Sequence, residues 1–176
     1  MPLNTTTENN ILKKYRRNRN VFIETGTADG EGIDFALDAG FKEVYSIELS
    51  EKLYNNAIEK FKNYDNVHLI LGSSEIELPK LLDTINSSFV LWLDAHWSGG
   101  VYIGELMNVY LPKEIKSILT YSSKFDKSAV LIDDMNHYIS DTNFINTVEE
   151  LVMKLNPNYK ISYEELAYST ILVAKK

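Results

Sequence analysis

Apolar residues form short runs along the chain, separated by longer stretches with helical periodicity. Four runs are almost continuously apolar, at 21–23, 67–71, 89–93 and 129–132, and polar or acidic residues follow each of them. Such runs are typical of parallel strands buried on both faces, and the stretches between them are long enough for helices. The pattern predicts an α/β fold: one doubly wound, mostly parallel sheet with helices on both faces.

The expected elements alternate without a break. Strands are predicted at 21–25, 43–49, 67–71, 89–94 and 129–132, and helices at 30–39, 51–61, 75–85, 105–121 and 142–155. Ser50 is expected to cap one helix and Gly40 to end another, and Pro112 to interrupt or start the helix at 105–121. Strand-like segments at 159–164 and 170–174 end the chain. We expect a lead-in with a short helix at 1–20 and one domain at 21–176.

Composition narrows the class of protein. The 176 residues carry a net charge of -7, which argues against general attraction to nucleic acids or anionic membranes. The chain has no cysteine, which excludes disulfides, thiolate zinc sites and thiol nucleophiles. No apolar run approaches the ~20 residues that span a bilayer, and the first residues do not resemble a signal peptide. A cytoplasmic protein is expected.

The only basic run of the sequence lies near the N-terminus, at Lys13, Lys14, Arg16, Arg17 and Arg19. A run of this kind is usually the solvated face of a helix, and that is the favoured interpretation. The alternative is that the run holds an acidic substrate or partner.

The stretch VFIETGTADGEG at 21–32 carries the first functional signal. An apolar strand reaches Glu24 and then a turn that contains Gly26, Gly30 and Gly32. Glycines let a backbone approach a ligand closely, and the following helix N-terminus favours polar or anionic groups. The spacing differs from the dinucleotide pattern G-x-G-x-x-G, and the Glu24 carboxylate would repel a pyrophosphate. A ligand with positive charge or hydroxyls fits better, although the turn could also be a simple connection.

Acids recur where the other predicted strands end. Glu48 ends the second strand, Asp94 the fourth and Asp133-Asp134 the fifth, whereas the third ends in Gly72-Ser73-Ser74. Ligands of open α/β sheets bind at the carboxyl ends of the strands. Clustered carboxylates repel each other unless a cation or bound donors neutralise them, so this edge is the predicted site.

The segments ETGTADGEG, YSIELS, ILGSS and WLDAHWSGG, in this order, resemble the class I S-adenosylmethionine-dependent methyltransferases. The resemblance covers nearly the whole chain and implies an antiparallel last strand. It implies that the turn at 24–32, including Glu24, Gly26, Thr27 and Gly30, wraps the methionine part of S-adenosylmethionine. Glu48 would hold the ribose, and Leu49, Ser73 and Ser74 would flank the adenine. The family often has an acid at the third strand end, where this chain has Gly72-Ser73-Ser74.

The last two strand ends are similar to those of the metal-dependent O-methyltransferases of the catechol and macrocin types. Asp94, Asp133 and Asp134 would converge, and three carboxylates suit Mg²⁺. The metal would bind adjacent oxygens of a vicinal diol, either a sugar or a catechol-like ring. The alternatives are that Asp133-Asp134 forms a polar turn with a helix cap, and that Asp94 contacts only the amino group of the cofactor.

The loop after Asp94 supplies the remaining candidates. His96 is the expected general base, because histidine titrates near neutral pH and lies two residues beyond the strand end. His137 is a second candidate, and His68, inside an apolar strand, is expected to be structural. The segment 97–102 is interpreted as a lid, with Trp97 or Tyr102 touching substrate, or as a plain surface loop.

The leading hypothesis is therefore an O-methyltransferase that uses S-adenosylmethionine and Mg²⁺ on a small molecule, with no nucleic-acid or membrane partner. A metal-independent methyltransferase and a non-catalytic S-adenosylmethionine-binding module of a complex are the alternatives. The first turn argues against an NAD enzyme. Formation of a homo-oligomer is left open.

Overall fold

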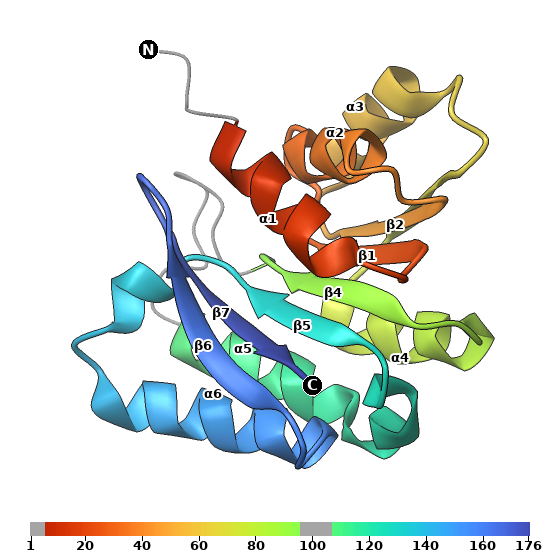
Figure 1. Ribbon diagram of the computed structural model, residues 1–176. Coiled ribbons are helices and arrows are strands. Elements are labelled where there is room, and N and C mark those ends of the chain that lie inside the picture. The colour runs from red at the N-terminus through yellow and green to blue at the C-terminus, as the bar shows by residue number, and fades with distance from the viewer. Residues whose placement is uncertain (1–5, 96–106) are drawn as a thin grey trace.

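The computed structural model describes residues 6–95 and 107–176, and its centre is a seven-stranded sheet (Figure 1). The strands lie in the order β3-β2-β1-β4-β5-β7-β6. They are β1 (Val21–Thr25), β2 (Glu43–Glu48), β3 (Val67–Leu71), β4 (Phe89–Leu93), β5 (Ala129–Ile132), β6 (Lys160–Glu165) and β7 (Thr170–Lys175). The first five strands are parallel, and β7 pairs antiparallel with both β5 and β6. The predicted fold class and the antiparallel last strand are confirmed.

Three helices cover each face of the sheet (Figure 1). One face carries α1 (Thr6–Arg16), α2 (Glu31–Asp38) and α3 (Glu51–Phe61); the other carries α4 (Ser74–Thr84), α5 (Met107–Ser117) and α6 (Thr142–Leu155). Successive strand residues point to opposite faces. In β1, Phe22 packs with the α1–α3 layer and Ile23 with the α4–α6 layer, and both are fully buried. This double burial explains the continuous apolar runs in the sequence.

The expectation that all four apolar runs are buried on both faces is wrong for β3. Its residues are only partly buried and Leu71 is exposed, because β3 is an edge strand whose other neighbour is solvent. His68 in this strand is structural: its ring stacks on Tyr45, and its Nε2 lies 2.8 Å from an oxygen of Glu43.

The described residues form two 3₁₀ helices that the sequence did not predict. The helix expected at 105–121 ends at Ser117, and a 3₁₀ segment, η1 (Leu119–Phe125), follows it. Pro112 lies inside α5 and neither starts nor interrupts it. A second 3₁₀ helix, η2 (Met135–Tyr138), begins directly after the Asp133-Asp134 pair. No described helix is both long and apolar enough to cross a membrane.

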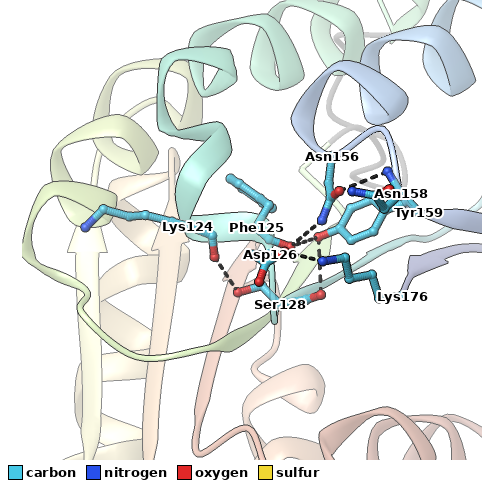
Figure 2. Close-up of polar contacts among 8 residues, drawn as sticks. All are labelled: Lys124, Phe125, Asp126, Ser128, Asn156, Asn158, Tyr159 and Lys176. Atoms are coloured by element: carbon cyan, nitrogen blue, oxygen red, sulfur yellow. Dashed lines mark hydrogen bonds and ion pairs between the residues drawn. The ribbon is translucent and has the colours of Figure 1, made fainter.

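A network of polar contacts lies at the end of the sheet opposite the predicted site (Figure 2). The hydroxyl of Tyr159 donates to the carbonyls of Phe125 and Ser128 at 2.9 and 3.2 Å, and the amide of Asn156 donates to Phe125 at 3.1 Å. The Ser128 hydroxyl donates to the carbonyl of Lys124 at 2.8 Å. These bonds satisfy carbonyl groups that the short helix η1 leaves without partners before β5 begins.

Candidate functional site

The carboxyl ends of the parallel strands meet at one edge, because sheet hydrogen bonds continue into the turns. The backbone N–H of Gly26 donates to Ile47, that of Asp94 to Thr25, and that of Asp133 to Leu93, at 2.9–3.1 Å. The predicted site residues of β1, β2, β4 and β5 therefore lie side by side. This proximity follows from the register alone.

The turn between β1 and α2 is tightly enclosed. Gly26 has a φ of 86°, and a Cβ there would lie 2.7 Å from the carbonyl oxygen of Asp94. A Cβ on Gly32 would lie 2.1 Å from the Glu24 Oε2 atom. Both distances are far inside van der Waals contact, so these two positions cannot carry a side chain without movement of their neighbours.

Glu24 is buried beneath this turn, with only 2% of its surface exposed. Its Oε1 accepts a hydrogen bond from the Ser46 hydroxyl at 2.6 Å, and Ser46 also shares a 2.5 Å hydrogen bond with the Thr27 hydroxyl. Burial raises the pKa of Glu24 to about 8; the Ser46 hydroxyl lowers it and the nearby Glu48 raises it further. A cation in contact with Glu24 would favour its charged form.

Glu48, at the end of β2, is also buried, and its carboxylate accepts hydrogen bonds from two segments. Oε2 accepts the backbone N–H of Ala28 at 3.0 Å, and Oε1 accepts that of Ser50 at 2.8 Å. Glu48 thus joins the β1–α2 turn to the start of α3. Each carboxylate oxygen can accept a further bond, which leaves the predicted contact with a ribose feasible.

The residues predicted to flank an adenine lie at the ends of β2 and β3. The Leu49 side chain is 60% exposed, although leucine is apolar. Ser73 caps the start of α4 by position, without a side-chain hydrogen bond, and Ser74 is its first residue. The exposed side chain of Leu49 therefore provides an apolar surface at this edge of the sheet, where the adenine is predicted to bind.

Asp133 is oriented by two hydrogen bonds to its Oδ1 atom. The Asp134 backbone N–H donates to it at 2.7 Å, and the hydroxyl of Ser169, in the β6–β7 turn, donates as well. Burial raises the pKa of Asp133, and both donors act in the opposite direction. Asp134 adopts a left-handed backbone with φ 57°, and its pKa is raised by burial and by the charge of Asp133.

The three aspartates predicted as magnesium ligands do not form a ready-made cation site. Among residues 6–95 and 107–176, no three His, Cys, Asp or Glu side chains converge closely enough to hold a metal ion. Asp94 and Asp133 line the same cavity, whereas Asp134 does not. Asp134 instead lies 4.0 Å from the Nε2 atom of His137. Of the three predicted ligands, Asp94 and Asp133 thus share the cavity, and the magnesium assignment stays a prediction.

The cavity at this edge has a volume of about 340 Å³ and two kinds of lining. Its acidic wall consists of Glu24, Asp29, Glu31, Asp94 and Asp133. Its apolar wall consists of Leu12, Phe22, Phe35 and Trp92. The backbone of the β1–α2 turn completes the lining. Trp92 is 7% exposed and contributes to both the core and the cavity.

His96, the predicted general base, lies outside the described residues, as do the expected lid at 97–102 and its Trp97 and Tyr102. The basic run in α1 is a structural feature: Lys13 pairs with Asp38 and Lys14 with Glu164. Arg19 is buried and donates to the carbonyls of Lys127 and Tyr15.

Three polar residues at the site, of which Ser46 and Glu114 are buried and Ser169 is partly buried, had no clear signal in the sequence. Ser46 and Ser169 orient Glu24 and Asp133 as described above. The third is Glu114 in α5, which is 3% exposed, with burial raising its pKa to about 7 and the hydroxyls of Ser74 and Thr25 lowering it. A serine inside a strand, a serine in a turn and one acid in a helix are too common to be singled out by pattern.

Comparisons with known proteins place this geometry in a fold family. No family model matches the sequence, and no curated protein matches it. Solved structures do match: the SAH-bound methyltransferase PaMTH1 of Podospora anserina is 17% identical with a TM-score of 0.66, covering 96% of this chain and 78% of that one. The SAH-bound O-methyltransferase of Bacillus cereus is 16% identical with a TM-score of 0.70, covering 97% and 81%.

A third matched structure is a fibrillarin and is not named as an O-methyltransferase. Fibrillarin of Aeropyrum pernix, solved with S-adenosyl-L-methionine, is 13% identical with a TM-score of 0.60, covering 88% of this chain and 66% of that one. At these identities the likeness establishes the fold, and the diversity of the matched proteins leaves the methyl acceptor undetermined. The chain has the fold of the class I S-adenosylmethionine-dependent methyltransferases, the family that its sequence motifs resemble.

Proposed function

We propose that the protein is an S-adenosylmethionine-dependent O-methyltransferase that acts on a hydroxyl of a small vicinal diol. The observation that carries the proposal is the cavity at the carboxyl ends of β1, β4 and β5. Buried Glu24, the enclosed glycine turn, Asp94 and Asp133 line it together. The matched O-methyltransferase of Bacillus cereus binds SAH on the same fold, which supports this cofactor.

The residues would divide the work as follows. S-adenosylmethionine supplies an electrophilic methyl group on a sulfonium. The turn from Gly26 to Gly32 would hold its methionine part against Glu24, and Glu48 would accept a ribose hydroxyl in addition to its two backbone donors. Asp94 and Asp133 would hold the acceptor hydroxyls beside the methyl group, where orientation accelerates transfer.

Methyl transfer to a hydroxyl releases one proton, which a base must accept. The acceptor oxygen forms a bond to the methyl carbon as the carbon–sulfur bond breaks, and the hydroxyl proton passes to a base. The sequence assigns that proton to His96. The raised pKa of Asp133 also suits a carboxylate that shares a proton with a hydroxyl.

Magnesium dependence is a separate part of the proposal. The described carboxylates do not form a three-ligand set, so no step is assigned to a metal. The alternative is the metal-independent form of the same reaction, in which Asp94 and Asp133 orient the acceptor directly. Activity measured with Mg²⁺ and with EDTA distinguishes the two forms.

The test is calorimetric titration with S-adenosylmethionine, followed by turnover on catechols and vicinal sugar diols. We expect binding by the wild type, and methyl transfer that falls by a factor of about 100 in Asp133→Asn if Asp133 orients or deprotonates the acceptor. Asp126→Asn is the matched control, because Asp126 lies at the opposite end of the sheet and pairs with Lys176. Binding without turnover on any diol would favour a non-catalytic module. Absence of binding would refute the cofactor assignment.

A further inference from the structure

The side chains that line the cavity indicate which charge the methyl acceptor can carry. Four large apolar side chains and five carboxyl groups line a volume of about 340 Å³. Within the part of the chain that the structure describes, no lysine, arginine or histidine contributes to the lining. A site built in this way offers apolar side chains and negative charge, and no cationic side chain that would attract an anion.

The basic residues around the cavity are engaged in contacts within the chain. The Nζ atom of Lys60 donates to the backbone carbonyl of Asp29, a lining residue, at 2.8 Å and pairs with Asp34 at 2.8 Å. The cavity-lining helix α1 contains Lys13 and Lys14, each of which forms a 2.7–2.8 Å ion pair with an acid outside the lining. Arg19, just beyond α1, donates to two backbone carbonyls at 2.8 and 2.9 Å.

The cofactor does not cancel this charge. S-adenosylmethionine carries a sulfonium, an ammonium and a carboxylate, which is a net of one positive charge. One net positive charge can neutralise one carboxylate such as Glu24, but four further carboxyl groups line the same cavity. The cofactor-loaded site is therefore still negative, and like charges held close together oppose binding.

Building on the proposed function, we infer that the acceptor has an apolar body with a neutral or positively charged substituent, and that the site discriminates against anionic acceptors. The apolar wall would pack against a ring or chain. The acidic wall would attract a cationic substituent and repel a carboxylate, phosphate or acyl-CoA group.

The test compares three catechols that carry a small substituent of different charge at the same ring position: 3,4-dihydroxyphenethylamine, 4-ethylcatechol and 3,4-dihydroxyphenylacetate. We expect kcat/KM to fall in that order, with the amine at least about tenfold above the carboxylate in low salt. The difference should shrink as the ionic strength rises, because screening weakens charge selection. Equal values, or faster turnover of the carboxylate, would overturn the inference.

A pair of variants tests whether the acidic wall causes the selectivity. Glu31 is the first residue of α2 and lines the cavity, whereas Glu51 is the first residue of α3 and does not. Glu31→Gln should lower the ratio of amine to carboxylate turnover about threefold, and Glu51→Gln should leave it unchanged. Because both changes remove an acid from the first turn of a helix, an equal effect on the ratio would argue against the cavity as the cause.

Failure of the proposed function is distinguishable from failure of this inference. If the protein binds S-adenosylmethionine but methylates none of the three catechols, the proposed function fails. The charge preference is then measured by calorimetry of the same compounds on cofactor-loaded protein. Tighter binding of the amine supports the inference, and equal binding, no binding or tighter binding of the carboxylate refutes it.

Discussion

Replacing Glu24 with glutamine should make the protein more stable at alkaline pH. Glu24 is 2% exposed, and burial raises its pKa from 4.5 to about 8 in the folded chain. Below pH 4.5 the folded and unfolded chains both hold the proton, so the residue contributes no pH dependence. Between pH 4.5 and 8 the unfolded chain releases the proton while the folded chain keeps it, and stability therefore falls as the pH rises.

The magnitude follows from the displacement of the pKa. One pKa unit corresponds to about 1.4 kcal/mol, so a rise from 4.5 to about 8 costs up to about 5 kcal/mol once the pH exceeds 8. The loss is spread over the interval at no more than about 1.4 kcal/mol per pH unit. Glutamine has no titration of its own, and its side-chain oxygen can still accept the hydrogen bond from Ser46.

The assay is urea unfolding of the wild type and Glu24→Gln at several pH values from 4 to 9. The free energy of unfolding of the variant minus that of the wild type should increase through this range and then level off. Taking the difference removes the other titrating groups, which both proteins share. Glu51→Gln, at an exposed position, should give a flat difference. A flat or decreasing difference for Glu24→Gln would refute the argument that this carboxyl is neutral in the folded protein.

Three further changes test the site and the fold. Gly32→Ala brings a methyl group within 2.1 Å of Glu24 and should cost about 1–3 kcal/mol in urea unfolding and weaken S-adenosylmethionine binding in calorimetry. Lys60→Met removes the 2.8 Å hydrogen bond to the turn carbonyl of Asp29, so cofactor affinity should drop several-fold, whereas Lys62→Met should leave it unchanged. Tyr159→Phe removes the donor shared by two carbonyls in Figure 2 and should cost about 1–3 kcal/mol in urea unfolding, without affecting cofactor binding.

The sequence predicted the sheet well because the burial of the strands is local information. Strands β1, β4 and β5 lie between two helical layers; β4 and β5 are apolar at every position, and β1 is apolar up to Ile23. The same rule failed for β3, because an edge strand can have the same composition with less burial. The insertion of β7 between β5 and β6 depends on pairing between distant segments, which no local pattern encodes.

The position of the candidate site was also predictable from the sequence, but the hydrogen bonds between its residues were not. The carboxyl ends of parallel strands must share an edge, so Glu24, Glu48, Asp94 and Asp133 were expected to meet. Which atoms accept hydrogen bonds depends on residues far along the chain, such as Ser169, which lies 36 positions from Asp133. That partner and the left-handed backbone of Asp134 give the two aspartates different surroundings.

Glu24 also shows why stability alone does not account for this edge of the sheet. Its carboxyl is buried, its direct hydrogen-bond partner is the Ser46 hydroxyl, and the nearest cation that affects its pKa, Lys60, has a smaller influence than the acids Glu48 and Asp34. A buried acid in such surroundings destabilises the empty protein above pH 4.5, and a neutral residue would avoid that cost. A cationic ligand reverses the balance, because it stabilises the charged carboxylate and is stabilised by it. We therefore expect saturating S-adenosylmethionine to reduce the pH-dependent stability difference between the wild type and Glu24→Gln, and an undiminished difference would argue against contact between Glu24 and the positive charges of the cofactor.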